Sequence, residues 1–173
     1  MIHKSSIVSS TAKVDSSTYI GPFCTIGDDV IIGKNNKLIS HVSITGNTII
    51  NDNNTFYPFC SIGSEPQDLK FRNEKSFLEI GSNNKFRENV TVNPGTQGGG
   101  LKTIIKNNCL FMVGSHIAHD CKINSNVILA NNATLAGHVE IDNNAILGGN
   151  SAVHQYVRIG KYSMIGGMSG VEK

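Results

Sequence analysis

The chain has 173 residues, of which 39% are apolar, 16% are charged and 18 are glycine, and its formal net charge is +2. This length suits a single domain, and so small a net charge argues against nucleic-acid binding by bulk electrostatics. The sequence contains no apolar run long enough to cross a bilayer and no signal-peptide-like segment after Met1. We therefore expect a cytoplasmic protein without a membrane span and without nucleic acid as a partner.

A six-residue repeat runs through nearly the whole chain. Large apolar residues occupy every sixth position in three runs, 2–62, 80–92 and, one residue out of phase, 105–171. This period fits neither a helix of 3.6 residues per turn nor the alternation of a hairpin. Gly or Asn often follows each of these anchors, and a small or β-branched residue usually lies two positions before it. Because positions two apart on a strand point the same way, each hexad predicts a short strand and a corner, and the series predicts a parallel β-solenoid.

Two segments interrupt the repeat. The first, at about 64–78, would place Asp68 and Glu74 at core positions, and the second, at about 93–104, is rich in glycine. We expect both to loop out of the scaffold, where long loops usually carry function. The first interruption separates two anchors, Ile62 and Ile80, by eighteen residues, which indicates one full coil of three hexads.

All four cysteines lie two residues before an anchor, so we expect them to be free thiols that fill the core. They are Cys24, Cys60, Cys109 and Cys121. No CxxC-like spacing is present, which argues against a metal or redox role for these residues.

Four of the six histidines hold fixed places in the repeat. Their anchors, at positions 117, 135 and 153, are eighteen residues apart, so on an eighteen-residue coil they should lie near one edge on three successive coils, about 4.8 Å apart. The four are His116, His119, His138 and His154, whereas His3 and His41 are isolated and expected to be exposed.

Three interpretations of this histidine column are open. A neutral imidazole can act as a general base at pH 7, and Asp120 beside His119 would orient it. Three histidines can instead hold zinc with an open fourth position, as in the carbonic anhydrases that share a left-handed β-helix. A solenoid without chemistry would explain the repeat, but not the joint occurrence of loops, histidines and Asp120.

The hexad pattern resembles that of the hexapeptide-repeat acyltransferases, and five segments make the resemblance more specific. Segments 61–70, 116–121, 129–138, 152–155 and 166–171 look like the UDP-N-acetylglucosamine O-acyltransferases of lipid A synthesis, in order and with both interruptions in place. The resemblance implies an all-β, left-handed parallel β-helix with three hexads per coil, as one acyltransferase domain over residues 1–173. It also implies a homotrimer with active sites between neighbouring prisms.

That family moves a 3-hydroxyacyl chain from acyl carrier protein to the 3-hydroxyl of UDP-N-acetylglucosamine, the first step of lipid A biosynthesis. The resemblance implies no cofactor and no metal. It assigns His119 as the general base, Asp120 as its orienting partner and Gly137 as the backbone N–H donor to the oxyanion. The residues that it assigns to substrate binding are Gln67, Asp68, Lys70, His116, His138, His154, Gln155 and Gly167. Gly167 would leave the acyl channel open, while Met168 beside it could shorten the channel.

The chain departs from the family pattern in two places. Asn93 stands where the best-known relatives carry histidine, and the chain stops at Lys173, where the family continues into a helical C-terminal region that we expect to be absent. These departures leave open whether the chain is a fragment or a minimal relative, and a minimal relative could be a sugar-nucleotide N-acyltransferase that uses an acyl-CoA and an amino sugar. A zinc-dependent, carbonic-anhydrase-like β-helix is the third reading.

Overall fold

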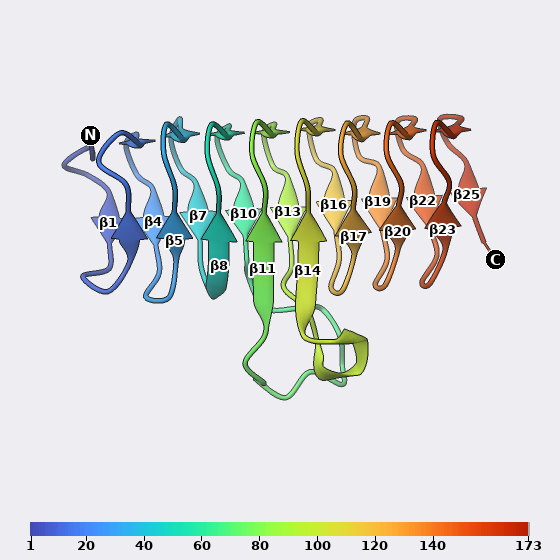
Figure 1. The fold of residues 1–173 in the computed structure, drawn as a ribbon, viewed down its shortest axis with the longest axis horizontal. Helices are drawn as coiled ribbons and strands as arrows, with labels where there is room; N and C mark the ends of the chain where they lie inside the picture. The colour runs from blue at the N-terminus through green and yellow to red at the C-terminus, as the bar shows by residue number, and fades with distance from the viewer. Residues whose placement is uncertain (173) are drawn as a thin grey trace.

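A computed structural model describes residues 1–172 of the chain. These residues form a left-handed parallel β-helix whose coils stack along one axis, from the N-terminus at one end to the C-terminus at the other (Figure 1). Each coil contributes one short strand to each of three parallel sheets, so the scaffold is a triangular prism. The predicted all-β solenoid is therefore confirmed.

The first sheet has nine strands, in the order β1 (Ile7–Val8), β4 (Thr25–Ile26), β7 (Ser43–Ile44), β10 (Ser61–Ile62), β13 (Thr91–Val92), β16 (His116–Ile117), β19 (Thr134–Leu135), β22 (Ala152–Val153) and β25 (Gly170–Val171). The second has eight, β2 (Lys13–Val14), β5 (Ile31–Ile32), β8 (Asn47–Ile50), β11 (Phe77–Ile80), β14 (Lys102–Ile105), β17 (Lys122–Ile123), β20 (Glu140–Ile141) and β23 (Arg158–Ile159). The third also has eight, β3 (Tyr19–Ile20), β6 (Lys37–Leu38), β9 (Thr55–Phe56), β12 (Lys85–Phe86), β15 (Leu110–Phe111), β18 (Ile128–Leu129), β21 (Ile146–Leu147) and β24 (Met164–Ile165).

The register of the sheets confirms the eighteen-residue coil, but Ile62 and Ile80 lie on the first and second sheets, so the first interruption spans one corner and not a full coil. Ile117 pairs with Leu135, and Leu135 pairs with Val153, so each anchor lies on the anchor of the next coil. The anchors fill the prism, and three of them, Phe56, Phe86 and Phe111, form a ladder with ring centroids 4.7 and 4.9 Å apart. Since each coil buries its apolar side chains mainly against its neighbours, the core is one continuous column.

The four cysteines are buried and free, as predicted. Burial raises the pKa of Cys60 and of Cys121 to about 12 and that of Cys109 to about 11. Such thiols stay protonated at neutral pH, so they are poor nucleophiles.

The three corners of the prism differ in their side chains. The corner from the second to the third sheet, which we call the asparagine corner, carries a positive φ at Asn35, Asn53, Asn83, Asn108, Asn126, Asn144 and Tyr162. Asparagine is among the residues that best tolerate this left-handed conformation, which explains the recurrence of Asn in the sequence.

Both predicted loops leave the prism at the corner from the first to the second sheet, which we call the loop corner, and they project from the same side (Figure 1). They span residues 63–76 and 93–101, and the second contains a short 3-10 helix, η1 (Gln97–Gly99). Both end earlier than predicted, because β11 and β14 are four residues long and already point Leu78 and Thr103 into the core. Within residues 1–172 no helix is long and apolar enough to cross a membrane.

Candidate functional site

The coils place successive pairs of residues above one another at the loop corner. The backbone N–H of His138 donates to the carbonyl of His119 (3.0 Å), and that of Tyr156 donates to the carbonyl of Gly137 (3.3 Å). Two short columns result, His119–Gly137–Gln155 and Asp120–His138–Tyr156. All three members of the second column have φ near +60°, so the backbone holds their side chains at the turn itself.

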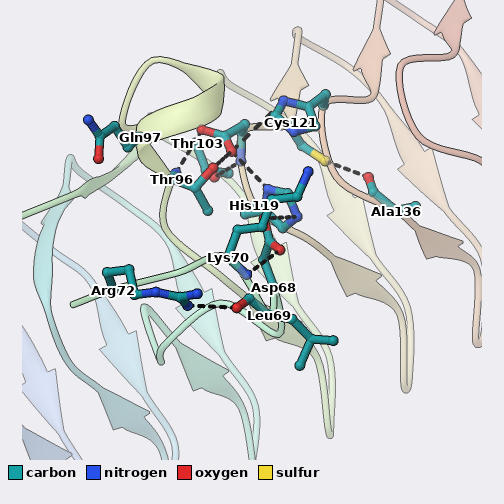
Figure 2. Close-up of polar contacts among 12 residues, drawn as sticks. Asp68, Leu69, Lys70, Arg72, Thr96, Gln97, Thr103, His119, Cys121 and Ala136 are labelled. Atoms are coloured by element: carbon teal, nitrogen blue, oxygen red, sulfur yellow. Dashed lines mark hydrogen bonds and ion pairs between the residues drawn. The ribbon is translucent and has the colours of Figure 1, made fainter. Parts of the chain in front are cut away.

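The core of the site is a buried His119–Asp120 pair. The imidazole Nδ1 of His119 lies 2.8 Å from Oδ2 of Asp120, and both residues are buried. Because an ionised carboxylate only accepts hydrogen bonds, this contact assigns the ring proton to Nδ1 and leaves the lone pair on Nε2. Nε2 points toward the first loop, where it lies 4.0 Å from the carboxylate of Asp68 (Figure 2).

Asp120 is itself fixed by the second loop. Its carboxylate accepts from the backbone N–H of Thr96 (2.9 Å) and from the Thr96 hydroxyl (2.6 Å), and its own N–H donates to the hydroxyl of Thr103 (2.8 Å). Burial alone would raise the pKa of Asp120, but hydrogen bonds from His119 and Thr96 outweigh it and lower the pKa. The group therefore stays ionised at neutral pH and holds His119 in a single orientation.

Gly137 lies directly beneath the His119 ring. A Cβ at this position would stand 2.5 Å from Nε2 and would collide with the rest of the imidazole, so a glycine is required for the close approach. Within residues 1–172 we find no acceptor for the Gly137 N–H. A backbone donor with no partner beside a base is the arrangement that stabilises an oxyanion.

His138 completes the wall of the site. Its ring meets that of His119 edge to face at 5.0 Å, and Tyr156 stacks flat on its other face, with centroids 4.3 Å apart. Burial lowers the pKa of His138, against the opposing effect of the Asp120 charge. Tyr156 was not predicted, although its place eighteen residues after His138 could have identified it.

A carboxylate joins the two loops above these residues. One oxygen of Glu74 accepts from the backbone N–H of Gln97 (3.0 Å), and the other accepts from that of Arg72 (2.7 Å). These two bonds, the first from Gln97, lower the pKa of Glu74. Asp68 caps the turn that carries Lys70, with Oδ1 2.9 Å from the Lys70 N–H (Figure 2). The loops thus form one unit that brings Asp68 and Lys70 to His119.

Asn93, the position that departs from the family, supports the base of this unit. It is buried, and its side-chain amide donates to the carbonyls of Ser64 (3.0 Å) and Glu65 (3.2 Å). It does not line the pocket formed above His119, so its role in the described chain is to hold the two loops together.

The loops and the corner enclose an open pocket of about 490 Å³, a size typical of small-molecule sites. Its lining residues are Asp68, Lys70, Glu74, Thr96, Gln97, Gly98, His119, His138, Gln155 and Tyr156. The predicted residues Asp68, Lys70, His119, His138 and Gln155 therefore meet in one place. Sequence reasoning missed Glu74 and Thr96, because their contacts depend on loop conformations that carry no periodic signal.

The other predicted residues lie outside this pocket. His116 is half-buried on the outer face of β16, with Nδ1 2.7 Å from the Thr91 hydroxyl, and burial lowers its pKa. His154 is exposed beside a separate shallow hollow, Gln67 is exposed on the first loop, and Gly167 follows β24 at a different corner. Of the four histidines expected near one edge, His119 and His138 line this pocket, whereas His116 and His154 do not. A residue just before an anchor points outward from its strand, whereas residues two or three after it lie in the turn.

The three-histidine zinc site of the third reading is not formed by the described residues. Two histidines and a carboxylate come together instead, since one donor atom from each of His119, Asp120 and His138 lies within 4.8 Å of the others. The arrangement favours proton transfer at Nε2 of His119, because Nδ1 already donates to Asp120.

Comparison with known proteins agrees with the fold and the motifs. A family profile described as bacterial transferase hexapeptide (six repeats) matches residues 102–137. The acyl-[acyl-carrier-protein]–UDP-N-acetylglucosamine O-acyltransferase of Thermodesulfovibrio yellowstonii is 49% identical over 136 residues, which are 79% of this chain and 53% of the relative. The protein of the same name from Rickettsia bellii is 56% identical over 122 residues, 70% of this chain and 43% of the relative.

Two solved structures superpose closely on this one. LpxA from Acinetobacter baumannii has 45% identity and a TM-score of 0.98, covering 99% of this chain and 67% of that one. The UDP-N-acetylglucosamine O-acyltransferase of Moraxella catarrhalis has 44% identity and a TM-score of 0.97, with coverage of 99% and 67%. The chain spans about half the length of the curated relatives and about two thirds of these structures.

Proposed function

Because the chain belongs to the UDP-N-acetylglucosamine O-acyltransferase family, we propose that it transfers a 3-hydroxyacyl chain from acyl carrier protein to the 3-hydroxyl of UDP-N-acetylglucosamine. This is the first step of lipid A biosynthesis, and we propose that it takes place in the cytoplasm. The observation that carries the proposal is the Nε2 lone pair of His119, which faces a pocket of substrate size and lies over the Gly137 backbone.

The mechanism is direct transfer by general-base catalysis. Nε2 of His119 takes the proton of the sugar 3-hydroxyl, and the oxygen attacks the thioester carbonyl carbon. The Gly137 N–H stabilises the oxyanion, a donor that is typically worth about 3 kcal/mol. The C–S bond then breaks, and His119 returns the proton to the departing thiolate. No cofactor is needed, and the buried protonated cysteines are unsuited to form an acyl-enzyme.

The ionised and neutral groups around the base serve this cycle. Asp120 stabilises the imidazolium that forms on His119 when the proton moves. The lowered pKa of His138 keeps that ring neutral at pH 7. It therefore places no positive charge beside His119 that would disfavour protonation of the base. Asp68 and Lys70 on the first loop offer a negative and a positive group to the hydroxyls and phosphates of a sugar nucleotide.

We propose further that the protein acts as a homotrimer with its sites between neighbouring prisms. The predicted residues His116, His154 and Gly167 do not line the pocket of their own chain, and a neighbouring copy can use them. The outer face of the third sheet supports this, because it exposes the apolar side chains of Ile146 and Met164.

An assay with two substrate pairs tests the activity. The protein is incubated with UDP-N-acetylglucosamine and a 3-hydroxyacyl carrier protein and, in parallel, with a 3-amino sugar nucleotide and acetyl-CoA. We expect an O-acylated product from the first pair. Turnover of only the second pair would favour the N-acyltransferase alternative, and turnover of neither would contradict both.

A mixing experiment tests the shared site. His119→Ala and His116→Ala chains are each expected to lose activity alone. Mixed trimers should regain part of it, since some sites then combine an intact His119 from one chain with an intact His116 from another. Verified mixed trimers without recovery would place both residues in the site of one chain, and light scattering that shows a monomer would overturn the trimer.

A further inference from the structure

His119, Asp120 and His138 together offer the donor atoms of a metal site. The acyl-transfer mechanism uses no metal there. We propose that this cluster binds one Zn²⁺ ion per chain, and that the bound ion blocks His119 as a proton acceptor. The first half concerns binding alone. The second half rests on the proposed function.

The donor atoms are close to the positions that zinc requires. Nδ1 of His119 and Nδ1 of His138 lie 2.8 and 3.9 Å from the same oxygen, Oδ2 of Asp120. In a tetrahedral site with bonds of about 2.0–2.1 Å, neighbouring donor atoms lie about 3.4 Å apart. One of these two contacts has to open and the other to close, each by less than about 1 Å, and the donor atoms of the three residues all lie within 4.8 Å of one another. Two histidines, a carboxylate and an open fourth position form a ligand set of catalytic zinc sites.

The carboxylate is already held in place for an ion. Thr96 donates to both oxygens of Asp120, and Thr103 accepts from its backbone N–H. Gly99 packs so closely on the carboxylate that a Cβ would collide with it. Contacts of this kind, made to a residue that ligates a metal, orient that residue and raise metal affinity. Zinc is favoured over magnesium, because two of the three donors are imidazole nitrogens.

A second hollow gives the cluster access to solvent. Asp120 and His138 line it together with Gly99, Lys122, Glu140, Tyr156 and Arg158. Glu140 is paired with Lys122 and with Arg158, each at 3.1 Å, so one carboxylate offsets one of the two positive charges. The fourth position of the ion would open here, where water can complete the coordination.

Zinc at this place changes the tautomer of His119. The free enzyme keeps a proton on Nδ1, which donates to Asp120, and a lone pair on Nε2. A metal ion on Nδ1 uses the lone pair of that nitrogen, so the neutral ring must carry its proton on Nε2 instead. The nitrogen that faces the pocket is then an N–H donor and can no longer accept the sugar proton.

Calorimetric titration of the full chain with ZnCl₂ tests binding without any assay of activity. We expect one ion per chain for the wild type. His138→Gln should weaken zinc binding at least about 10- to 100-fold, the range already seen when outer contacts of metal sites are lost. The matched control His3→Gln removes an exposed histidine elsewhere and should bind zinc like the wild type. Equal affinity in wild type and His138→Gln would overturn the site.

Asp120→Asn provides a second variant of nearly unchanged shape, in case His138→Gln folds poorly. It removes the negative ligand and should also weaken zinc binding by at least about 10-fold. Circular dichroism establishes which variants are folded, and the site is rejected if a folded Asp120→Asn protein binds zinc as the wild type does.

The ring ¹⁵N resonances of His119 test the tautomer. Without zinc, Nε2 should show the shift of an unprotonated nitrogen, and with zinc the shift of an N–H. Where acyl transfer is measurable, equimolar zinc should abolish it and EDTA should restore it. An unprotonated Nε2 in the zinc-bound protein, or full activity with zinc bound, would overturn the blocking. Absence of acyl transfer without zinc would contradict only the proposed function, because titration and resonance still decide the site.

Discussion

Two corners of the same prism share a backbone conformation and carry very different side chains. At the asparagine corner, six of the seven residues with positive φ are asparagine, and the turns have no insertions. At the loop corner the corresponding residues on the last three coils are Asp120, His138 and Tyr156, and both loops leave from the same edge. Left-handed residues other than glycine cost of order 1 kcal/mol or more, and asparagine the least. The first corner follows the preference of the backbone, whereas the second accepts strain to place reactive groups.

The largest expected effect at the loop corner comes from removal of the base, His119. His119→Ala should lower kcat/KM by about 10²- to 10⁴-fold, the usual contribution of a general base. The matched control His41→Ala changes an exposed histidine that lies between Phe23 and Phe59 at the third corner and should leave the rate unchanged. Steady-state kinetics with the two acyl-transfer substrates measure both, and an active His119→Ala protein would remove the base from the mechanism.

Gly137→Ala tests whether the loop corner depends on close packing over the backbone. The new methyl group would collide with the His119 ring, and displacing a base by about 1 Å can cost about 10²-fold in rate. Gly170→Ala is the control, because nothing lies within 4 Å of a Cβ at that position. If both alanine variants turn over substrate equally fast, the position of the imidazole is not set by Gly137.

Glu74 links the two loops, which have no equivalent at the asparagine corner. Glu74→Ala removes two charge-assisted hydrogen bonds, and we expect KM to rise roughly 10-fold because the loops are no longer held together. The turnover number should change little, since Glu74 does not contact His119. Glu74→Gln keeps one acceptor and should restore part of the affinity. A fall in kcat at unchanged KM would instead assign Glu74 to the chemical step.

The same substitution at the two corners separates strain from function. Tyr162→Asn, at the asparagine corner, should raise stability by about 1 kcal/mol through relief of the left-handed conformation, which shifts Tm by about 2–4 °C. Its activity should be unchanged. Tyr156→Asn gains the same relief but loses the stack on His138, worth about 0.5–1.5 kcal/mol, so its Tm should barely move while kcat falls. Equal gains in Tm for both variants would show that the stack contributes nothing.

The smallest expected effect is on the pH dependence of stability. The folded chain holds the pKa values of His116 and His138 below the usual 6.5. Between those lowered values and 6.5 the unfolded chain binds more protons, so stability falls as pH drops through this window. The depressed pKa of Asp120 acts only at lower pH, where its stabilising contribution is lost as pH falls below 3.8. Thermal unfolding at pH 7.5 and 5.5 should show a larger loss in wild type than in His116→Gln.

The repeat predicted the scaffold well, because every sixth residue must be apolar if the prism is to close. The buried cysteines and the position of both loops follow from this phase, whereas the eighteen-residue coil came from the family resemblance. The direction of side chains near the corners did not follow. His116 lies on β16 just before its anchor and outside the pocket that His119 lines. Tyr156 carries an αL conformation that residue preference opposes, so it could be found only by its spacing.

The contacts of Thr96 and Glu74 could not be predicted from the sequence, for a different reason. Each meets a residue more than twenty positions away through a loop, Asp120 for Thr96 and Gln97 for Glu74. Loop conformation depends on the sum of many weak local preferences, and no period relates these residues. The family resemblance gave Asp68 and Lys70 their roles, but the carboxylate that holds their loop in place is visible only in the structure.

The stacking of equal coils makes the prism a ruler with a fixed graduation of about 4.8 Å. The corner residues of the site lie on three consecutive coils, at His119, Gly137 and Gln155. Whole coils can therefore be added or removed between β1 and β7 without altering any distance within the site, which changes the length of the prism and not the geometry of the site. A single residue inserted between 121 and 136 has the opposite effect, since it leaves length intact and exchanges inside for outside in the next coil. The prism should thus tolerate an insertion of eighteen residues and should not tolerate an insertion of one.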